Sequence, residues 1–374
     1  MGNIATLQDL GCSVYHDGMS RSLIRSGAVD RLIRLGVSGV TTNPVIFHQA
    51  ISSGADYEEQ ITSDARSGQP SYAVMWDVIV EDVRLAADMF EPVYRKANGA
   101  DGYVSVEVDP ALADDADGTL AAARRLWSRI DRPNVMIKVP ATEAGISCVE
   151  PLTFDGINVN VTVVATIEAF ESVFRAHARG LARRIEAGAR PDVVSVASLF
   201  LSRIDSVVDQ AIDELATKLT GETEALAALK GKAGLATAKL AYRRFHELRL
   251  DNEHHRLWQA GGKPQRLLWA STAPRNPSYP KLMYVEGLIG PDTVITLPPV
   301  TLEEFEDRGA ARAGTLTEGA DEAAMLWDRL NALGITAETV KAGVHSIVLP
   351  LFAQAMQQLE ALVDERCKVR LSPI

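Results

Sequence analysis

The segment NVMIKVP, residues 134–140, has the alternation of a β-strand and carries a lysine on one of its two sides. Its β-branched residues at alternate positions share one side, so Met136 and Lys138 fall on the other. Similar runs lie to either side of it, YVSVEVDP at 103–110 and NVNVTVV at 158–164. Amphipathic stretches of helical period separate these runs, which predicts strands joined by helices.

Eight such runs occur along the chain, bounded by Gly, Pro and Asp. They cover residues 12–17, 39–44, 103–110, 134–140, 158–164, 193–200, 266–272 and 293–299. Strands that alternate with helices pair in parallel, and a parallel sheet needs cover on both faces, as in a doubly wound sheet or a closed barrel. Polar residues near the ends of many runs, without a G-x-G-x-x-G or P-loop sequence, favour the barrel. We therefore predict an α/β fold of the (β/α)8 barrel type.

The segments between these runs and after them are expected to be helical. Helices are predicted over 21–35, 72–97, 119–130, 167–186 and from Leu302 onward, the last opened by Thr301–Glu304 as a capping box. Three segments exceed a minimal barrel: residues 43–103, which add a loop and a long helix, a helical insertion at about 206–262, and a C-terminal segment at about 337–368. Pro350 is expected to cause a kink in the last of these. We predict one barrel domain over residues 1–374.

Composition limits the partners and the compartment. The chain has 38 Lys+Arg and 49 Asp+Glu, and 38 − 49 gives a net charge of −11, which argues against nucleic acid or an anionic membrane as a partner. Three widely spaced cysteines cannot build a disulfide framework or a thiolate zinc site. The N-terminus lacks a signal-peptide pattern, and apolar runs such as VVSVASLFL at 193–201 are too short to span a bilayer. We expect a soluble cytoplasmic protein.

Lys138 is the first candidate for chemistry. An ammonium buried without a partner loses its charge more easily, so its pKa falls from about 10.4 toward neutrality and the amine can attack a carbonyl carbon. Alternatively, a lysine at a strand end reaches solvent or neutralises acidic neighbours. The neighbouring strands favour the first interpretation, since each of them also places its polar residues on a single side. These residues are Ser105, Glu107 and Asp109 in the run 103–110, and Asn158, Asn160 and Thr162 in the run 158–164. Barrel interiors are usually aliphatic, so these residues form either a reactive cluster or a satisfied structural network.

A Schiff-base mechanism needs this set of groups. Glu107 could transfer protons to and from the lysine adduct through a water positioned by Thr162. Asp17, at the end of the first run, is the candidate base for the C4 hydroxyl of a ketose. Asn43 and Asn160 are neutral and could bind substrate hydroxyls.

The later strands supply a candidate phosphate site. SLFLSRID and WASTAPRNP carry Ser198, Phe200, Arg203, Ser271 and Arg275, and arginine binds phosphate through a planar fork. Arg203 could equally form an ion pair with Asp205. Seven scattered histidines form no metal-ligand pattern, which disfavours a metal-dependent route, and we predict no metal.

Taken together, these motifs resemble transaldolase, in the longer form seen in actinobacteria and their relatives. The similar segments follow the family's order: GVTTNPVIF (39–47), NVMIKVPATEAG (134–145), DGINVNVTVV (155–164), SVASLFLSRID (195–205), LLWASTAPRNPSY (267–279) and LIGPDTVITLPP (288–299). The resemblance extends over nearly the whole chain. The chain departs from the family pattern in two places. His16 stands where the family usually has an apolar residue, and Arg275 stands where a lysine is common.

The resemblance implies ping-pong transfer of a dihydroxyacetone unit, without a cofactor, from sedoheptulose 7-phosphate or fructose 6-phosphate to glyceraldehyde 3-phosphate or erythrose 4-phosphate. The match to the second signature implies Lys138 as the Schiff-base lysine. The remaining roles carry over as acid and base groups (Asp17, Glu107), water positioning (Thr162), donor binding (Asn43, Asn160), site lining (Ser198, Phe200) and phosphate binding (Arg203, Ser271, Arg275).

Several alternatives stay open. A related aldolase would use the same lysine but release free dihydroxyacetone, and a transaldolase paralogue could serve specialised metabolism. A barrel that only binds sugar phosphate would form no covalent adduct. Apart from these small molecules, the sequence predicts no nucleic-acid or membrane partner, and both a monomer and a homodimer are compatible with it.

Overall fold

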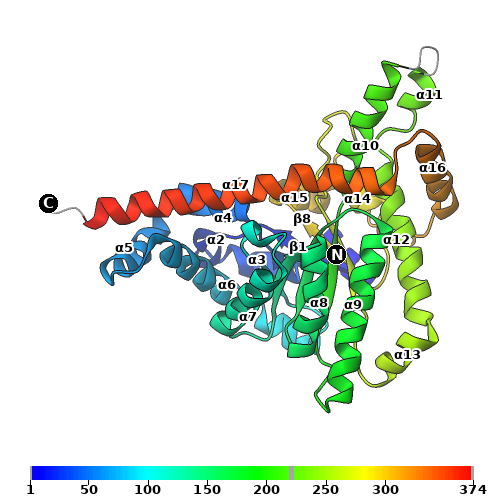
Figure 1. Cartoon of the computed structure of the whole chain (residues 1–374). Helices are drawn as coiled ribbons and strands as arrows, with labels where there is room; N and C mark the ends of the chain where they lie inside the picture. Colours follow the sequence, from blue (N-terminus) through cyan, green and yellow to red (C-terminus); the bar gives the residue numbers. More distant parts are fainter. Residues whose placement is uncertain (1, 219–222, 372–374) are drawn as a thin grey trace.

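The computed structural model describes residues 2–218 and 223–371 (Figure 1). Within these residues, eight strands form a closed barrel in sequence order, each parallel to its neighbours, as β8 pairs with β1. The strands are β1 (Cys12–Asp17), β2 (Gly39–Thr41), β3 (Val104–Glu107), β4 (Val135–Pro140), β5 (Val159–Val164), β6 (Ser195–Phe200), β7 (Arg266–Ala270) and β8 (Thr293–Leu297). The predicted (β/α)8 barrel is confirmed, and each predicted run contains one strand.

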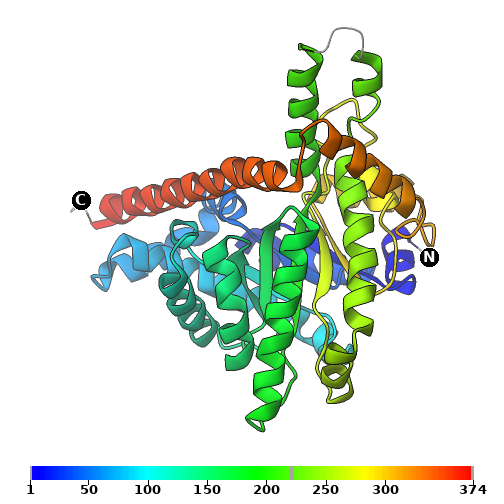
Figure 2. The same cartoon turned by 45° about the vertical axis from the view of Figure 1, so that its right-hand side comes forward.

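Helices follow the strands and cover the outside of the barrel (Figures 1 and 2). The helices before β6 are α1 (Asn3–Asp9), α2 (Arg21–Arg25), α3 (Ala28–Leu35), α4 (Pro44–Ser53), α5 (Glu58–Arg66), α6 (Ser71–Lys96), α7 (Ala116–Ile130), α8 (Glu143–Asp155) and α9 (Ile167–Glu186), with short 3-10 turns η1 (Ala55–Tyr57) and η2 (Pro110–Leu112). Those after it are α10 (Leu201–Ala216), α11 (Thr223–Ala227), α12 (Ala233–Leu250), α13 (Asn252–Gln259), α14 (Met283–Glu286), α15 (Pro299–Arg308), α16 (Ala320–Ala332) and α17 (Ala337–Leu371).

Two predicted helix boundaries were wrong for identifiable reasons. The segment 21–35 is divided into α2 and α3, because Gly27 adopts φ +76°, a left-handed conformation that ends the first helix. The last barrel helix begins at Pro299 rather than after Thr301. Proline is favourable in the first turn, since its missing N–H would have no helical partner there, so Thr301 lies inside the helix and caps nothing.

The insertion predicted at about 206–262 consists of the helices α10 to α13 joined by short turns, whereas residues 219–222 lie outside the described part. Its α12 contacts α9, α10 and β7, and so takes the ordinary place of a barrel helix between β6 and β7. The far end of α10 and the short α11 project beyond the barrel (Figure 2). The extra length therefore lies in these elements and in α13.

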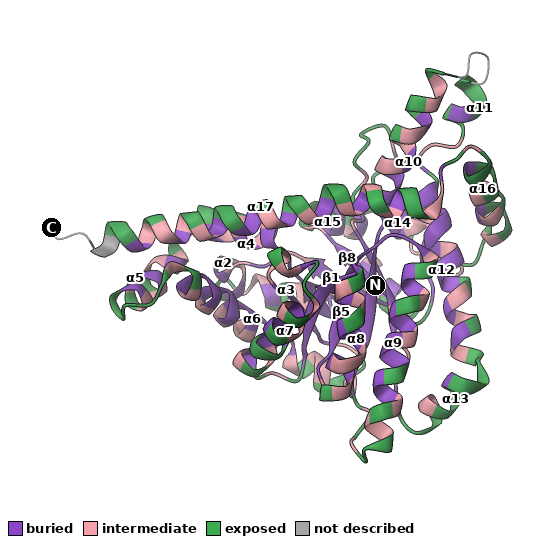
Figure 3. Cartoon of the chain, in the orientation of Figure 1, coloured by how far each residue is buried: buried purple, intermediate pink, exposed green. Residues whose placement is uncertain are grey.

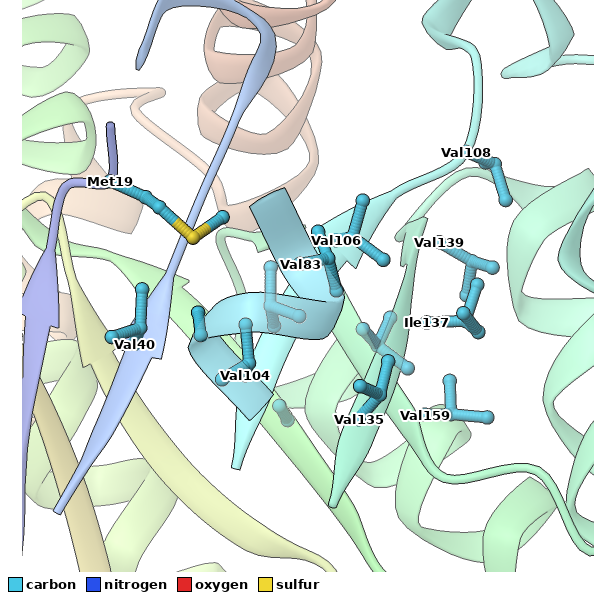
Figure 4. Packing of buried hydrophobic residues seen from close by; sticks show 14 of the residues in the cluster. Met19, Val40, Val83, Val104, Val106, Val108, Val135, Ile137, Val139 and Val159 are labelled. Carbon is cyan, nitrogen blue, oxygen red and sulfur yellow. The ribbon is translucent and has the colours of Figure 1, made fainter. Parts of the chain in front are cut away.

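The strands divide their residues between two separate sets of buried side chains. Outward residues such as Val104, Val106 and Val135 pack under the surrounding helices (Figure 4). Inward residues such as Met136 and Leu268 belong to a second cluster. This division confirms the predicted alternation along 134–140, which directs Lys138 into the barrel. The three cysteines Cys12, Cys148 and Cys367 are buried and unpaired.

The C-terminal helix α17 crosses one end of the barrel (Figures 1 and 2). It continues through Pro350 as one helix of 35 residues and contacts α4, α5, α6 and α10. Its buried side faces the barrel and its outer side is exposed (Figure 3). Among the described residues, α17 is the one helix that is long and apolar enough, over Ala337–Val369, to span a membrane. From the sequence, only shorter apolar runs were considered, and this segment was not identified. A third of its most apolar 18-residue window is buried against the rest of the protein.

A buried ion pair fixes the segment that follows β1. Arg21 Nε donates to Asp82 Oδ1 of α6 at 2.8 Å, and the two side chains are 3% and 0% exposed. Tyr57 bridges the two residues, because its hydroxyl accepts a hydrogen bond from the backbone N–H of Arg21 and donates one to Asp82 Oδ2. This triad attaches the connection after Asp17 to the longest helix of the outer layer before β3.

We expect Arg21→Ala to lower the free energy of unfolding by about 3–5 kcal/mol, because Asp82 would be left as a buried charge without its cation. The measurement is equilibrium urea denaturation. Arg25→Ala is the matched control in the same helix: Arg25 is 57% exposed and lies 3.6 Å from Asp56, so its removal should cost less than about 1 kcal/mol. Equal losses in the two variants would contradict the assignment.

Candidate active site

Strand register places three of the predicted residues side by side. Glu107 on β3 is paired with Lys138 on β4, and Lys138 is paired with Asn160 on β5. All three side chains point into the barrel, and the residues are at most 6% exposed. A level of the barrel that is usually aliphatic therefore holds a cation, a carboxylate and an amide.

Lys138 is buried, and two groups contact its amine. Nζ donates to the Thr42 carbonyl oxygen at 2.8 Å and lies 3.5 Å from Glu107 Oε1. The nitrogen is thus shielded from water, as expected, but it is not without a partner. Glu107 Oε2 is buried without a hydrogen-bond partner among the described residues, so this carboxylate keeps a free lone pair for a proton.

Asp17 lies at the end of β1, next to the same amine. Its Oδ1 accepts from Thr41 Oγ1 at 2.7 Å, and Thr41 Oγ1 is in turn 2.5 Å from Thr296 Oγ1. The neighbouring His16 points outward, and its Nδ1 is 2.7 Å from the Gly18 carbonyl oxygen. His16 therefore occupies a packing position, and its charge has a small lowering influence on the pKa of Asp17.

Burial dominates the electrostatics of both carboxylates. It raises the pKa of Asp17, while Thr41 and Lys138 lower that pKa in part. Burial likewise raises the pKa of Glu107, again opposed by Lys138. The two carboxylates also repel each other, since Asp17 adds to the upward shift of the Glu107 pKa. One cation thus partly stabilises two desolvated carboxylates, both of which are better proton acceptors than exposed ones.

A cavity of about 320 Å³ opens above these groups at the carboxyl ends of the strands. Nine of the eleven predicted site residues line it: Asp17, Asn43, Lys138, Thr162, Ser198, Phe200, Arg203, Ser271 and Arg275. The other two, Glu107 and Asn160, lie behind this lining. Glu107 reaches the cavity through Lys138, and Asn160 accepts from Ser198 Oγ at 2.7 Å.

The two asparagines differ in how their amides are used. Asn43 caps α4, since its Oδ1 accepts from Ile46 N–H at 3.1 Å, so its NH₂ group is the part available to a ligand. Asn160 is fully buried, and besides its bond from Ser198 it donates to Ser105 Oγ at 3.1 Å. Its side chain therefore belongs to a network that orients Ser198.

The two arginines stand at the mouth of the cavity. Neither forms an ion pair within residues 2–218 and 223–371, and burial together with repulsion from Arg275 lowers the pKa of Arg203 to about 10. The alternative ion pair with Asp205 is wrong, because Asp205 accepts from the Tyr284 hydroxyl at 2.5 Å and from Gly234 N–H at 2.9 Å. Two cations without counter-charges beside a polar cavity indicate an anionic ligand.

Comparison with known proteins identifies the family of this chain. Residues 14–363 match the model of the family described as transaldolase/fructose-6-phosphate aldolase. This chain belongs to that family. It is 40% identical over 355 residues to the transaldolase of Arthrobacter sp., covering 94% of each chain. It is 38% identical over 377 residues to transaldolase 2 of Nostoc sp., covering 97% of this chain and 98% of the relative. The transaldolase of Mycobacterium tuberculosis is 39% identical over 343 residues, covering 91% and 90%.

This member of the transaldolase/fructose-6-phosphate aldolase family also places residues in the cavity that sequence reasoning missed. Thr41 and Thr296 support Asp17, and their pattern of inward threonines near strand ends was a usable signal. Val348, Leu351 and Phe352 of α17 close the cavity from above, and the Phe352 ring lies 6.5 Å from that of Phe200. Nothing in the sequence of a distant amphipathic helix indicates which strands it will cover.

One residue grouped with the inward set lies elsewhere. Asp109 was placed on the side of Ser105 and Glu107, but β3 ends at Glu107. Asp109 instead caps the 3-10 turn η2 by accepting from Ala111 N–H, and it accepts from the Tyr72 hydroxyl at 2.9 Å. In the described part of the chain no group of three or more His, Cys, Asp or Glu residues is arranged to hold a metal ion.

The raised pKa of Asp17 has a consequence for stability. Its pKa lies above the usual 3.8 in the folded chain, so the folded state binds this proton more tightly than the unfolded state. As the pH rises from 3.8 through the folded-state pKa, the wild type therefore loses stability. Asp17→Asn keeps the acceptor for Thr41 and removes the desolvated charge.

We expect Asp17→Asn to be more stable than the wild type at about pH 8, with a smaller difference at about pH 5. Urea denaturation at the two pH values measures this. Asp9→Asn, at an exposed position in α1, is the control and should change little at either pH. A variant less stable than the wild type at the higher pH would contradict the assigned direction.

Proposed function

We propose that this chain is a transaldolase, which transfers a dihydroxyacetone unit between sugar phosphates through a Schiff base on Lys138. The observation that carries the proposal is the buried amine, 3.5 Å from a carboxylate and exposed to a polar cavity. The relatives at about 40% identity over nine-tenths or more of the chain, named transaldolase, support the same activity.

In the first half-reaction, the Lys138 amine attacks the C2 carbonyl of a ketose phosphate after Glu107 takes a proton from Nζ. The carbinolamine then loses its hydroxyl as water when Glu107 returns that proton. Thr162 Oγ1 is buried in the cavity lining and has no hydrogen-bond partner in the described part of the chain, which suits a hydroxyl that holds the transferring water. The resulting protonated imine withdraws electrons from C3.

Asp17 would then remove the proton of the C4 hydroxyl. The C3–C4 bond breaks, its electron pair moves into the imine to give an enamine, and an aldose phosphate leaves. In the second half-reaction the enamine carbon attacks the aldehyde of the acceptor, Asp17 returns its proton to the new hydroxyl, and water releases the product. The raised pKa values of Asp17 and Glu107 suit groups that must both accept and return protons.

Arg203 and Arg275 would bind the phosphate group. They lie at the cavity mouth where α10 begins, so the partial positive charge of this helix N-terminus adds to theirs. Ser271 O accepts from Ser202 N–H, and the Ser202 and Ser271 hydroxyls are 2.9 Å apart, which fixes the β7 end against α10. Asn43 would bind a donor hydroxyl through its free NH₂ group.

The decisive test is trapping of the imine. Incubation with fructose 6-phosphate and borohydride should add a reduced three-carbon adduct to Lys138, located by peptide mass spectrometry. Lys138→Met should give no adduct and should lower the turnover rate by at least about 1,000-fold, because the covalent route is lost. Lys239→Met is the control lysine, since its Nζ donates to Thr315 O outside the cavity. An adduct on a lysine other than Lys138, or active protein without any adduct, would overturn the proposal.

A second candidate function is kept because the family description names fructose-6-phosphate aldolase as well as transaldolase. An aldolase would release free dihydroxyacetone by hydrolysis of the enamine-derived imine. We expect that the chain forms glyceraldehyde 3-phosphate from fructose 6-phosphate in quantity only when erythrose 4-phosphate is present. If glyceraldehyde 3-phosphate forms equally fast with and without erythrose 4-phosphate, the chain is instead an aldolase.

We further propose that the protein acts in the cytoplasm on sugar phosphates, as a monomer or a homodimer, within one barrel domain. The net charge of −11 supports the absence of a nucleic-acid partner. The position of α17 against the barrel supports a soluble location for this apolar helix. No cofactor is needed for the steps described.

A further inference from the structure

We infer that His345, on the C-terminal helix, is a positioning residue for Thr162. This inference rests on the proposed function, because it assigns His345 a part in the same Schiff-base reaction. Its Nε2 lies 3.2 Å from the carbonyl oxygen of Val163, a residue 182 positions away and next to Thr162 in the chain. The structure thus connects α17 directly to the strand that carries the proposed water-binding hydroxyl.

The backbone at Val163 is unusual. Its φ is +61°, a left-handed conformation that a β-branched residue adopts only when its surroundings enforce it. The β5–β6 pairing shifts at this point, from Val161 opposite Ala197 to Val164 opposite Leu199. Thr162 and Val163 therefore form a bulge, which re-aims side chains near the end of a strand.

The bulge changes which way the side chains of β5 point. Val159, Val161 and Val164 belong to the outer cluster, so their spacing changes from two residues to three. Val163 instead belongs to the inner cluster, together with Val344 and Val348 of α17. Thr162, held by its carbonyl bond to Ala141 N–H at 2.8 Å, keeps its hydroxyl in the cavity lining.

His345 supplies the contact that this conformation lacks. A bulge removes a carbonyl from the regular ladder, and a buried carbonyl without a donor is unfavourable. Because the carbonyl can only accept, His345 Nε2 carries the hydrogen and donates. Burial lowers the pKa of His345, which favours the neutral ring, and the neutral tautomer with its hydrogen on Nε2 makes this bond. The packing of Val163 against α17 and the hydrogen bond from α17 act on the same strained residue.

The consequence concerns the rate of reaction more than binding. In the proposed reaction Thr162 takes part in forming and hydrolysing the imine, while the phosphate is bound by Arg203 and Arg275, which follow β6 and β7. A change in the bulge would misplace the hydroxyl by a fraction of an ångström to an ångström without removing any phosphate contact. Misplacement on this scale reduces catalysis strongly.

The test compares two substitutions of similar size. His345→Leu removes the donor, and we expect the single-turnover rate of imine formation at saturating fructose 6-phosphate, measured by borohydride trapping, to fall by about 10- to 100-fold. His345→Gln retains an N–H donor at similar reach and should recover most of that rate. The KM for fructose 6-phosphate should change by less than about threefold in both variants, since phosphate contacts are kept.

Val363→Ala controls for general loosening of α17, because Val363 is fully buried near the far end of the helix and away from the cavity. It should lower the melting temperature and leave the rate of imine formation unchanged. The inference is overturned if His345→Leu traps as fast as the wild type, or if its loss is matched by Val363→Ala or not recovered by His345→Gln. If the wild type itself forms no imine, the proposed function fails, which is a distinguishable result.

Discussion

The site depends on one interaction, the contact between the Lys138 amine and Glu107 Oε1 at 3.5 Å, made where both side chains are 6–7% exposed. A closed barrel makes it possible, because register between β3 and β4 brings the two residues opposite each other on the inner surface. Burial raises the pKa of Glu107, and Lys138 only partly opposes this, so the Glu107 carboxylate accepts a proton more readily than an exposed one would. The proposed nucleophile and the proposed proton acceptor are thus held together before any substrate arrives.

This arrangement is unfavourable for the fold in isolation. Asp17 and Glu107 are both desolvated, they repel each other, and they share the partial stabilisation that Lys138 gives. The surrounding barrel must therefore supply the stability that these charges remove. The outer cluster of aliphatic residues, visible in part in Figure 4, is independent of the inner polar level, because alternate residues of each strand face opposite sides. Substitution inside the barrel can consequently change chemistry without changing the packing outside it.

Much of this could be predicted from sequence because strand alternation is a strict period of two. Once VMIKVP is recognised as a strand, Lys138 must point opposite to Val135, and the same rule selects Glu107, Asn160 and Thr162. The errors arose where local backbone geometry overrides the pattern. Gly27 divides a helix, and Asp109 follows the strand end and turns away. The bulge at Val163 is a further case, since no local sequence feature marks a valine with positive φ.

Long-range contacts were the other part that could not be predicted. The apolar period of residues 337–368 indicates a helix with one buried side, but periodicity contains no information about which distant surface covers that side. In the structure Phe352 meets Phe200 above the cavity and His345 reaches the carbonyl of Val163. The cavity therefore has walls from the strand ends and a cover from the last helix of the chain. A barrel formed without α17 would keep Lys138, Asp17 and Glu107, but it would lose the His345 contact to the Val163 carbonyl beside Thr162, and with it one support of the proposed proton-transfer site.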